Sequence, residues 1–348
     1  MLLSSGKREG SLRKQISLFL WVALLASAAQ AQNKKIVVTG GFAGRAAELQ
    51  KASPQVTVVP ATDQEILQKV AEADAIFGTI NPQILKAGKN LKWVQIYSAG
   101  VENYVQYPEV VNSDIVMTNC KIIQGPNIAD HAMALLLALT RGIYQAIPLR
   151  SREEWLRGKY PFTTIELTNK TAVIIGLGGI GTQVAQRARA FGMRILAVDP
   201  KDIPITNVVE KIVTPDRLHE VLPEADVVFM SAPHTKQTEG MMGAAEFGMM
   251  KKGSYFIAVS RGKTYDSNAL VKALDEQRLA GAGLDVTNPE PLPKGHALWK
   301  FENVIITPHI AGGSDLVNDR RMALFKENIH RFVAGRPLLN VVDKQKGY

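Results

Sequence analysis

The stretch TAVIIGLGGIGTQVAQRARAFGMRILAVD, residues 171–199, decides the fold. An apolar, β-branched run ends in glycines spaced G-x-G-x-x-G, and a helix-like segment and a second apolar run follow. A strand, a glycine-rich turn, a helix and another strand form the context that a dinucleotide-binding loop requires. The stretch therefore predicts a βαβ unit with a dinucleotide site at its first turn.

The three glycines of this motif have different physical tasks. Gly176 permits the tight turn, Gly178 lets the backbone approach a pyrophosphate, and Gly181 allows the helix to pack closely on the strand. Gly179 and Ile180 open the helix, whose first turn offers free N–H groups and a partial positive charge to phosphates.

An acidic residue at the end of the second apolar run indicates which dinucleotide is bound. Asp199 stands eighteen residues after Gly181, where a carboxylate can accept hydrogen bonds from both ribose hydroxyls and repel a 2′-phosphate. This favours NAD over NADP. Lys201, two residues further on, leaves NADP open.

Outward from this stretch, short β-branched runs alternate with helical segments along the whole chain. Such alternation predicts α/β architecture with parallel sheets, in two similar domains. Residues 127–144 form a long apolar segment, expected as a helix buried either between domains or in an ordinary core. A helix near 315–334 is expected to complete the first domain. The expected strands are 35–41, 56–60, 74–79, 92–100 and 115–119 in the first domain, and 171–176, 194–199, 226–233, 253–260, 280–286 and 303–309 in the second.

Composition excludes several classes of protein. The 348 residues carry a net charge of +9, and no run of Lys and Arg with interleaved aromatic residues suggests nucleic-acid binding. Cys120 is the only cysteine, so neither an internal disulfide nor a cysteine-based metal cluster can form. No metal site is expected among the six His residues.

The N-terminus has the three parts of a secretory signal peptide. A basic segment precedes the apolar run ISLFLWVALLASAA (16–29), and Ala29-Gln30-Ala31 forms a small-x-small cleavage site. We expect residues 1–31 to be removed and the mature chain to be periplasmic or secreted, with no membrane segment. The alternatives are a retained N-terminal anchor or an unused signal and a cytoplasmic protein.

Three further segments stand where predicted strands end, which is where open α/β sheets bind ligands. They are Ser260-Arg261-Gly262, the segment from Asp285 to Pro289-Glu290-Pro291, and Thr307-Pro308-His309.

With these segments in view, the chain resembles the D-isomer-specific 2-hydroxyacid dehydrogenase family. The resemblance runs from about residue 70 to 335 through VIIGLGGIG, SAPHTKQT, AVSRG, GAGLDVTNPEPLP and TPHIAGG, in family order. It implies two Rossmann-like domains, with an NAD-binding domain (126–312) inserted into a substrate domain (32–125 and 313–348). It also implies a nicotinamide-dependent oxidoreductase of small 2-keto and 2-hydroxy acids, and a homodimer.

The resemblance also assigns roles. His309 resembles the acid/base that protonates the substrate carbonyl oxygen, Glu290 its carboxylate partner, and Arg261 the clamp for the substrate carboxylate. The residues expected at the substrate are Arg261 with the backbone of Ser98, Ala99, Gly100 and Val101. The resemblance adds Pro233, Thr238, Ser260, Asp285 and His309 to the cofactor site, with Asp285 expected to hold the nicotinamide carboxamide.

Two functions of different kinds remain open on the sequence. The favoured one is a dehydrogenase acting on a short acid such as glyoxylate or hydroxypyruvate. The alternative is an exported dinucleotide-sensing protein with little or no turnover.

Overall fold

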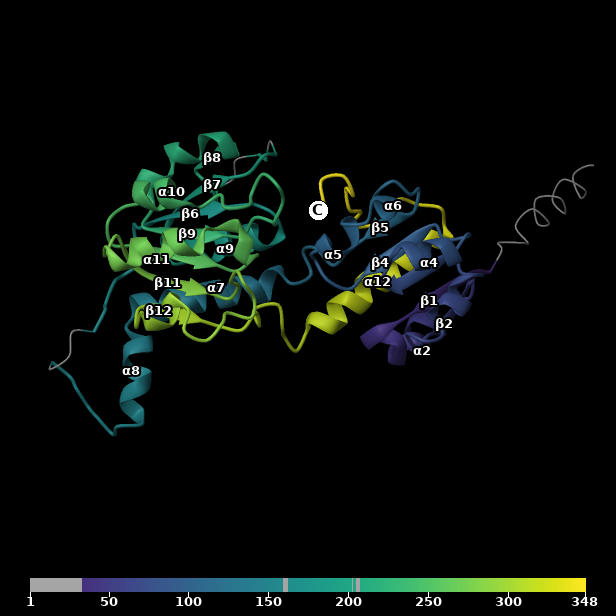
Figure 1. Ribbon diagram of the computed structural model, residues 1–348, viewed down its shortest axis with the longest axis horizontal. Coiled ribbons are helices and arrows are strands. Elements are labelled where there is room, and N and C mark those ends of the chain that lie inside the picture. Colours follow the sequence, from purple (N-terminus) through teal and green to yellow (C-terminus); the bar gives the residue numbers. More distant parts are fainter. Residues whose placement is uncertain (1–32, 159–161, 202, 205–206) are drawn as a thin grey trace, which may run out of the picture. The chain divides into compact units, whose positions relative to one another are not determined.

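The computed structural model describes residues 33–158, 162–201, 203–204 and 207–348 (Figure 1). The predicted signal peptide, residues 1–31, lies outside the described residues. The chain divides into two compact units, Met1–Gln95 with Phe325–Leu338, and Ile96–Leu324 with Leu339–Tyr348. Two parallel sheets, of five and seven strands, form the framework, so the predicted α/β class with two Rossmann-like domains is confirmed.

The seven-stranded sheet has the order β12-β11-β10-β9-β6-β7-β8, and every pair with a determined register is parallel. The order reverses between β6 and β9, which makes the carboxyl ends of these two strands the switch point where ligands bind. The strands are β6 (Thr171–Ile175), β7 (Arg194–Val198), β8 (Lys211–Val213), β9 (Val227–Met230), β10 (Ser254–Ala258), β11 (Leu279–Leu284) and β12 (Val304–Ile306).

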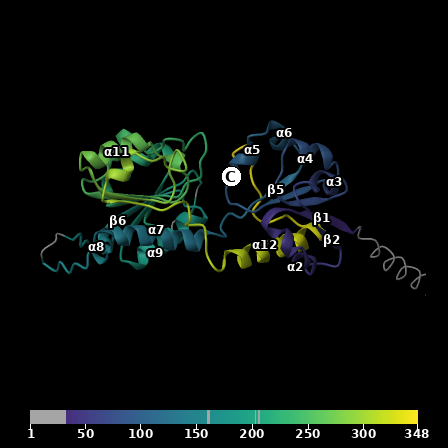
Figure 2. The same cartoon turned by 60° about the horizontal axis from the view of Figure 1, so that its bottom comes forward.

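Helices cover both faces of this sheet, as Figure 2 shows. Val173 and Ile175 of β6 belong to one apolar cluster, which contains α10 (Ala244–Met249) and α11 (Ser267–Asp275). The alternate residues Ala172 and Ile174 belong to the other, with α7 (Gly125–Thr140) and α9 (Gly179–Ala190). Burial on both faces explains why the strand is a continuous apolar run.

The long apolar segment is a core helix that ends earlier than expected. Helix α7 stops at Thr140, because Gly142 takes a left-handed conformation with φ of +65°. A separate helix, α8 (Ile143–Arg150), follows. The prediction of one helix over 127–144 was therefore wrong at the C-terminal end. Among the described residues no single helix is long and apolar enough to cross a membrane. Helices α7 and α8 reach the required length and apolar character only when they are taken together, and the pair is bent by 77°.

The five-stranded sheet has the order β2-β1-β3-β4-β5, with β1 parallel to both β2 and β3. Its strands are β1 (Lys34–Val38), β2 (Val56–Pro60), β3 (Ala75–Gly78), β4 (Trp93–Ile96) and β5 (Val116–Thr118). Its short helices are α2 (Ala46–Gln50), α3 (Ile66–Val70), α4 (Pro82–Ala87), α5 (Glu102–Val105) and α6 (Pro108–Val111). Strand β5 belongs to this sheet but lies beyond Gln95, where the first segment of the N-terminal unit ends. The domain boundaries expected at 125/126 and 312/313 therefore stay a prediction.

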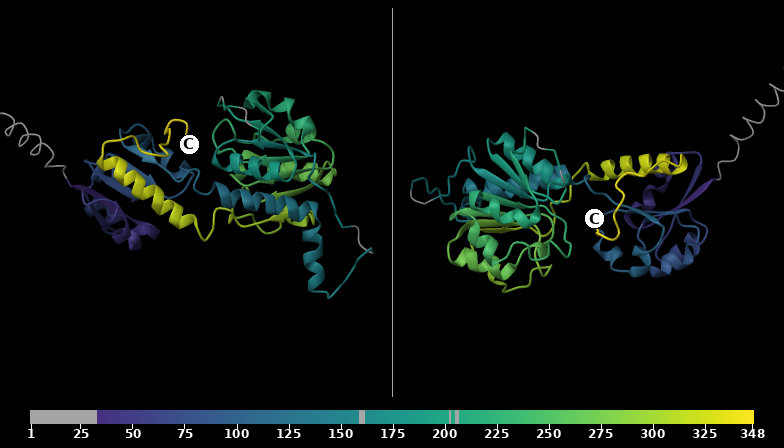
Figure 3. Two further views of the ribbon diagram at one scale, coloured as in Figure 1. Left: turned by 180° about the vertical axis from the view of Figure 1, so that it is seen from behind. Right: turned by 90° about the horizontal axis from the view of Figure 1, so that it is seen from above.

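Helix α12 (Val317–Val333) lies near the end of the chain (Figure 3), and from Phe325 onward it packs within the N-terminal unit. Phe325 is fully buried, with its ring centroid 5.2 Å from that of Phe42 and 5.5 Å from that of Phe77. Lys326 forms an ion pair with Glu48 at 2.8 Å. The part of α12 from Phe325 onward therefore belongs to the same compact unit as β1, β2 and β3.

Candidate functional site: a dinucleotide cavity and three strand-end loops

The glycine motif lies at the switch point of the seven-stranded sheet. Gly176 has φ of +88°, and a Cβ there would lie 2.6 Å from the Cα of Ala232, at the end of β9. A Cβ on Gly181 would collide with the carbonyl oxygen of Gly176. The Ser231 hydroxyl donates to that same carbonyl at 2.7 Å. Only glycine fits at positions 176 and 181, because backbone surrounds both.

Gly178 differs, because a Cβ there would meet no atom within 4 Å. It is the N-cap residue of α9, so this open space lies at the end of the helix that carries N–H groups without partners in the helix. Space beside a helix N-terminus suits a phosphate group.

Asp199 follows β7 and is buried with its carboxylate against the glycine turn. Its Oδ2 accepts a hydrogen bond from the N–H of Leu177 at 2.8 Å, and its Oδ1 accepts one from the N–H of Lys201 at 2.9 Å. Each carboxylate oxygen keeps a further lone pair for a hydroxyl.

A cavity of about 530 Å³ joins these features. Of the predicted cofactor residues, Gly176, Gly178, Asp199, Pro233 and Thr238 line it, whereas Gly179, Ile180 and Gly181 form the first turn of α9. Lys201, named beside Asp199 in the sequence, also lines the cavity. Several lining residues were not predicted from the sequence, among them Ile203, Pro215, Asp216, Gln237, Met241 and Tyr348.

Arg261 follows β10 and faces the predicted substrate loop. Its Nε donates to the Glu102 carboxylate at 2.9 Å, and its Nη1 donates to the carbonyl of Ser260 at 2.8 Å. Its Nη2 lies so close to Gly100 that a Cβ there would collide with it. The structure therefore brings Arg261 together with the loop 98–101, and it adds Glu102, which the sequence did not indicate.

Gly262 explains how Arg261 is held. A Cβ on Gly262 would collide with the carbonyl group of Thr287, so the two strand-end loops lie against each other. The Tyr265 hydroxyl donates to the carbonyl of Val286 at 2.8 Å and fixes the same contact. Burial raises the pKa of Tyr265, and the charge of Glu290 raises it further. The Tyr265 hydroxyl therefore stays protonated and can donate this hydrogen bond.

His309 and Glu290 form a pair. The distance between His309 Nδ1 and Glu290 Oε1 is 2.5 Å, and both side chains are about two-fifths exposed, at 43% and 41%. His309 has φ of +53°, a left-handed conformation that His adopts more readily than most residues. The carboxylate fixes Nδ1 and leaves Nε2 for a ligand. Both residues line a second cavity, of about 500 Å³.

Asp285 holds the segment that carries His309. Its carboxylate is 1% exposed and accepts hydrogen bonds from the Thr307 hydroxyl at 2.6 Å and from the N–H groups of Ile310 and Ala311 at 2.9 and 3.0 Å. His131 of α7 lies 2.8 Å from the same Thr307 hydroxyl. This network fixes the His309 loop; the expected contact of Asp285 with nicotinamide stays a prediction.

The comparisons with known proteins agree with this geometry. Residues 133–311 match the family model described as "D-isomer specific 2-hydroxyacid dehydrogenase, NAD binding domain". Glyoxylate reductase of Thermofilum pendens is 32% identical over 293 residues, which cover 82% of this chain and 86% of that protein. The chain belongs to the D-isomer specific 2-hydroxyacid dehydrogenase family. It is accordingly an NAD(P)-dependent oxidoreductase of 2-hydroxy acids.

Two solved structures of this dehydrogenase family show the same fold. A family protein from Aeromonas salmonicida subsp. salmonicida A449 has a TM-score of 0.78 and 26% identity, covering 90% of this chain and all of that one. A member from Xanthobacter autotrophicus Py2, in complex with NADPH and MES, also has a TM-score of 0.78, with 25% identity over 91% of this chain and 100% of that chain.

The residues present fit a dinucleotide of the kind that this dehydrogenase family binds. The space beside Gly178 is open. The hydroxyl of Ser260, at the end of β10, is buried and has no hydrogen-bond partner among the described residues. A buried hydroxyl without a partner is costly unless a ligand supplies one. Ser260 was among the predicted cofactor residues; it is not among the residues that line the cavity of about 530 Å³, and its contact with a cofactor stays a prediction.

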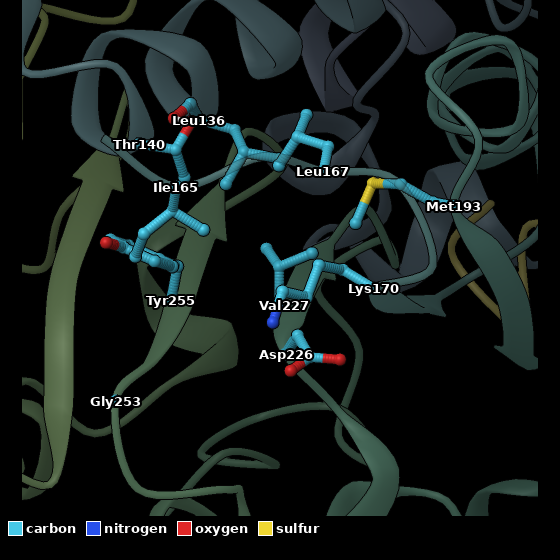
Figure 4. Close-up of a pocket in the computed structure, with 10 residues that line it drawn as sticks. All are labelled: Leu136, Thr140, Ile165, Leu167, Lys170, Met193, Asp226, Val227, Gly253 and Tyr255. Carbon is cyan, nitrogen blue, oxygen red and sulfur yellow. Dashed lines mark hydrogen bonds between the residues drawn. The ribbon is translucent and has the colours of Figure 1, made fainter. Parts of the chain in front are cut away.

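A third cavity lies at the opposite, amino-terminal edge of the dehydrogenase's large sheet (Figure 4). Its volume is about 60 Å³, room for about two water molecules. Leu136, Leu167 and Val227 line it together with Tyr255, whose pKa burial raises to about 12. Its size excludes a dinucleotide.

Cys120 contacts the predicted substrate loop through its backbone, whose N–H donates to the carbonyl of Ser98 at 2.9 Å. It is buried, and the loss of hydration raises the pKa of its thiol to about 12. The thiolate, the reactive form, is therefore absent at neutral pH.

The glycine turn gives a matched pair of tests. Gly181→Ala forces a Cβ into backbone, and we expect the free energy of unfolding to fall by about 1–3 kcal/mol. Gly178→Ala should unfold like the wild type, because its Cβ meets only empty space. It should nevertheless weaken NADH binding about tenfold or more, about 1.4 kcal/mol, by filling the space that a pyrophosphate needs.

Thermal unfolding and fluorescence titration with NADH separate the two effects. Unchanged NADH affinity in Gly178→Ala, with NADH bound by the wild type, would show that the pyrophosphate does not lie at this turn.

Proposed function

We propose that the protein uses NAD(H) to interconvert a small 2-keto acid and its D-2-hydroxy acid. The observation that supports this best is the combination of three parts. A dinucleotide cavity lies at the switch point, Arg261 faces the loop 98–101, and the His309–Glu290 pair stands at the end of β12. Registers between β10, β11 and β12 place their carboxyl ends along one edge of the sheet.

Each of these groups has one task in the proposed reaction. When bound, the nicotinamide supplies the hydride to C2 of the keto acid, or accepts it in reverse. Arg261 binds the substrate carboxylate through its fixed fork of N–H donors, helped by the backbone of Ser98 to Val101. Glu102 holds the guanidinium in place from its Nε side.

His309 handles the proton. With Nδ1 held by Glu290, its Nε2 donates a proton to the carbonyl oxygen during reduction and accepts one from the hydroxyl during oxidation. The contact with Glu290 keeps the imidazole ring in one orientation through this cycle.

We propose NAD as the preferred cofactor. The carboxylate of Asp199 lines the cavity where a ribose 2′-hydroxyl can bind and where a 2′-phosphate would meet negative charge. NADP is the competing cofactor, because Lys201 lies beside Asp199 and the Xanthobacter relative is in complex with NADPH. Glyoxylate and hydroxypyruvate are the proposed substrates, since several relatives about 32% identical are named glyoxylate reductase.

The decisive assay is NADH oxidation by the chain from Gln32, against glyoxylate, hydroxypyruvate, pyruvate and longer 2-keto acids, with NADPH in parallel. We expect turnover with short acids and NADH. His309→Ala should lower kcat by about 10²- to 10⁴-fold, because the proton donor is lost. His330→Ala, on the exposed side of α12, is the matched control and should behave as the wild type.

Wild-type kcat in His309→Ala would contradict the assigned role. No turnover over the whole panel, with NADH still bound, would favour the alternative of an exported dinucleotide sensor.

We further propose that the protein is a homodimer. Helix α8 projects from the body of its unit (Figure 3), and it and the following segment expose Ile143, Ile147 and Trp155, the last at 87%. Large apolar side chains that are exposed on a projecting element are candidates for an interaction surface. Light scattering on the purified protein should give twice the mass of one chain. The variant Ile147→Glu should give the mass of a monomer. A monomeric wild type would refute the dimer.

Export remains our proposal for localisation. It rests on the sequence of residues 1–31 alone, a basic segment, an apolar run and Ala29-Gln30-Ala31. N-terminal sequencing of protein from the native cells should begin at Gln32, and an intact N-terminus would refute cleavage.

A further inference from the structure

The last ten described residues, Leu339–Tyr348, belong to the same compact unit as the dinucleotide cavity, although the lining residue that precedes Tyr348 in the chain is Met241. Val341 forms an antiparallel bridge with Thr118 of β5. The N–H of Val342 donates to the carbonyl of Met117 at 2.8 Å. This segment, the C-terminal tail, is therefore fixed by backbone hydrogen bonds at its start.

A second anchor lies beyond this bridge. The ammonium group of Lys344 donates to the carbonyl oxygens of Val110, Ser113 and Ile115. Burial lowers the pKa of Lys344, and an ammonium surrounded by carbonyl oxygens satisfies its donors there.

The final residues turn back on this anchor. Asp343 Oδ1 accepts hydrogen bonds from the N–H groups of Gln345 and Lys346, at 3.1 and 3.0 Å, and the N–H of Gly347 donates to the carbonyl of Asp343 at 2.8 Å. The turn directs the chain so that Tyr348 becomes part of the cavity lining.

The position of Tyr348 in the cavity follows from its neighbour. The ammonium of Lys201 lies 5.7 Å from the centroid of the Tyr348 ring, within cation–π range. The backbone of Lys201 in turn donates to Asp199, the carboxylate expected at the adenosine ribose. The ring therefore lies at the adenosine end of the cavity, away from the strand-end loops of β10 to β12.

We propose that Tyr348 is a cofactor-binding residue that packs its ring against the adenosine part of the dinucleotide. This inference rests on the proposed function, because it requires a nicotinamide dinucleotide in the cavity. A half-buried aromatic ring held at a fixed place gives a base a surface on which to stack. The C-terminal tail thus forms one wall of the cofactor site and determines affinity, with no part in the chemistry.

The test is the dissociation constant of NADH and of ADP-ribose, measured by calorimetry on the whole chain. ADP-ribose carries the adenosine end and lacks nicotinamide. Tyr348→Ala should weaken the binding of both ligands by a similar factor, about tenfold. Tyr348→Phe keeps the ring and should bind within about twofold of the wild type. Gln345→Ala, an exposed side chain in the same tail, should leave both constants unchanged.

The outcomes separate the two proposals. If the wild type binds NADH and Tyr348→Ala binds it equally well or more tightly, the proposed role of Tyr348 is overturned and the dehydrogenase stands. If NADH binding weakens while ADP-ribose binding does not, the ring does not contact adenosine, and the proposal also fails. A wild type that binds neither NADH nor NADPH would overturn the proposed function and this inference with it.

Discussion

The close approach of three backbone segments at the carboxyl end of β6 is the constraint on which the site depends. The turn at Gly176, the start of α9 at Gly181 and the end of β9 at Ser231 lie so close together that no side chain fits between them. This packing opens the helix N-terminus toward the switch point of the sheet and sets the place of any dinucleotide. A phosphate at this place would meet the backbone N–H groups of the first turn of α9, and the side chains of the other strand ends would face the substrate.

Those strand ends are held by buried polar contacts. Asp285 accepts three hydrogen bonds from the segment 307–311, and His131 extends the network from α7. A buried carboxylate is tolerated because its oxygens are bonded in this way. The result is a His309 whose backbone is fixed and whose ring is oriented by Glu290, as a proton donor requires.

Much of this could be predicted from the sequence because the signals are local. The strand, glycines and helix of 171–199 are contiguous, and strand ends in a parallel sheet necessarily meet at one edge. The glycine motif and Asp199 were thus predicted from the residues. Family resemblance, more than spacing, supplied the pairing of His309 with Glu290. It also supplied the meeting of Arg261 with the loop 98–101.

What the sequence did not reveal depends on contacts between distant segments. Three contacts join residues 22 to 176 positions apart, with no local pattern to mark them: Glu102 with Arg261, Thr307 with Asp285 and His131, and Tyr348 with Lys201 in the cofactor cavity. The end of α7 was different, since Gly142 offered a signal for a helix break. Likewise, Asp266 caps α11, a helix that the sequence analysis did not identify, by accepting from the N–H groups of Asn268 and Ala269.

In the proposed reaction, Arg261, His309 and the dinucleotide cavity together present one face of the keto acid to the nicotinamide. The handedness of the product tests this most directly. Hydroxypyruvate reduced by the protein with NADH should give D-glycerate alone when the product is resolved by chiral chromatography. L-glycerate, or a mixture of the two isomers, would contradict the account.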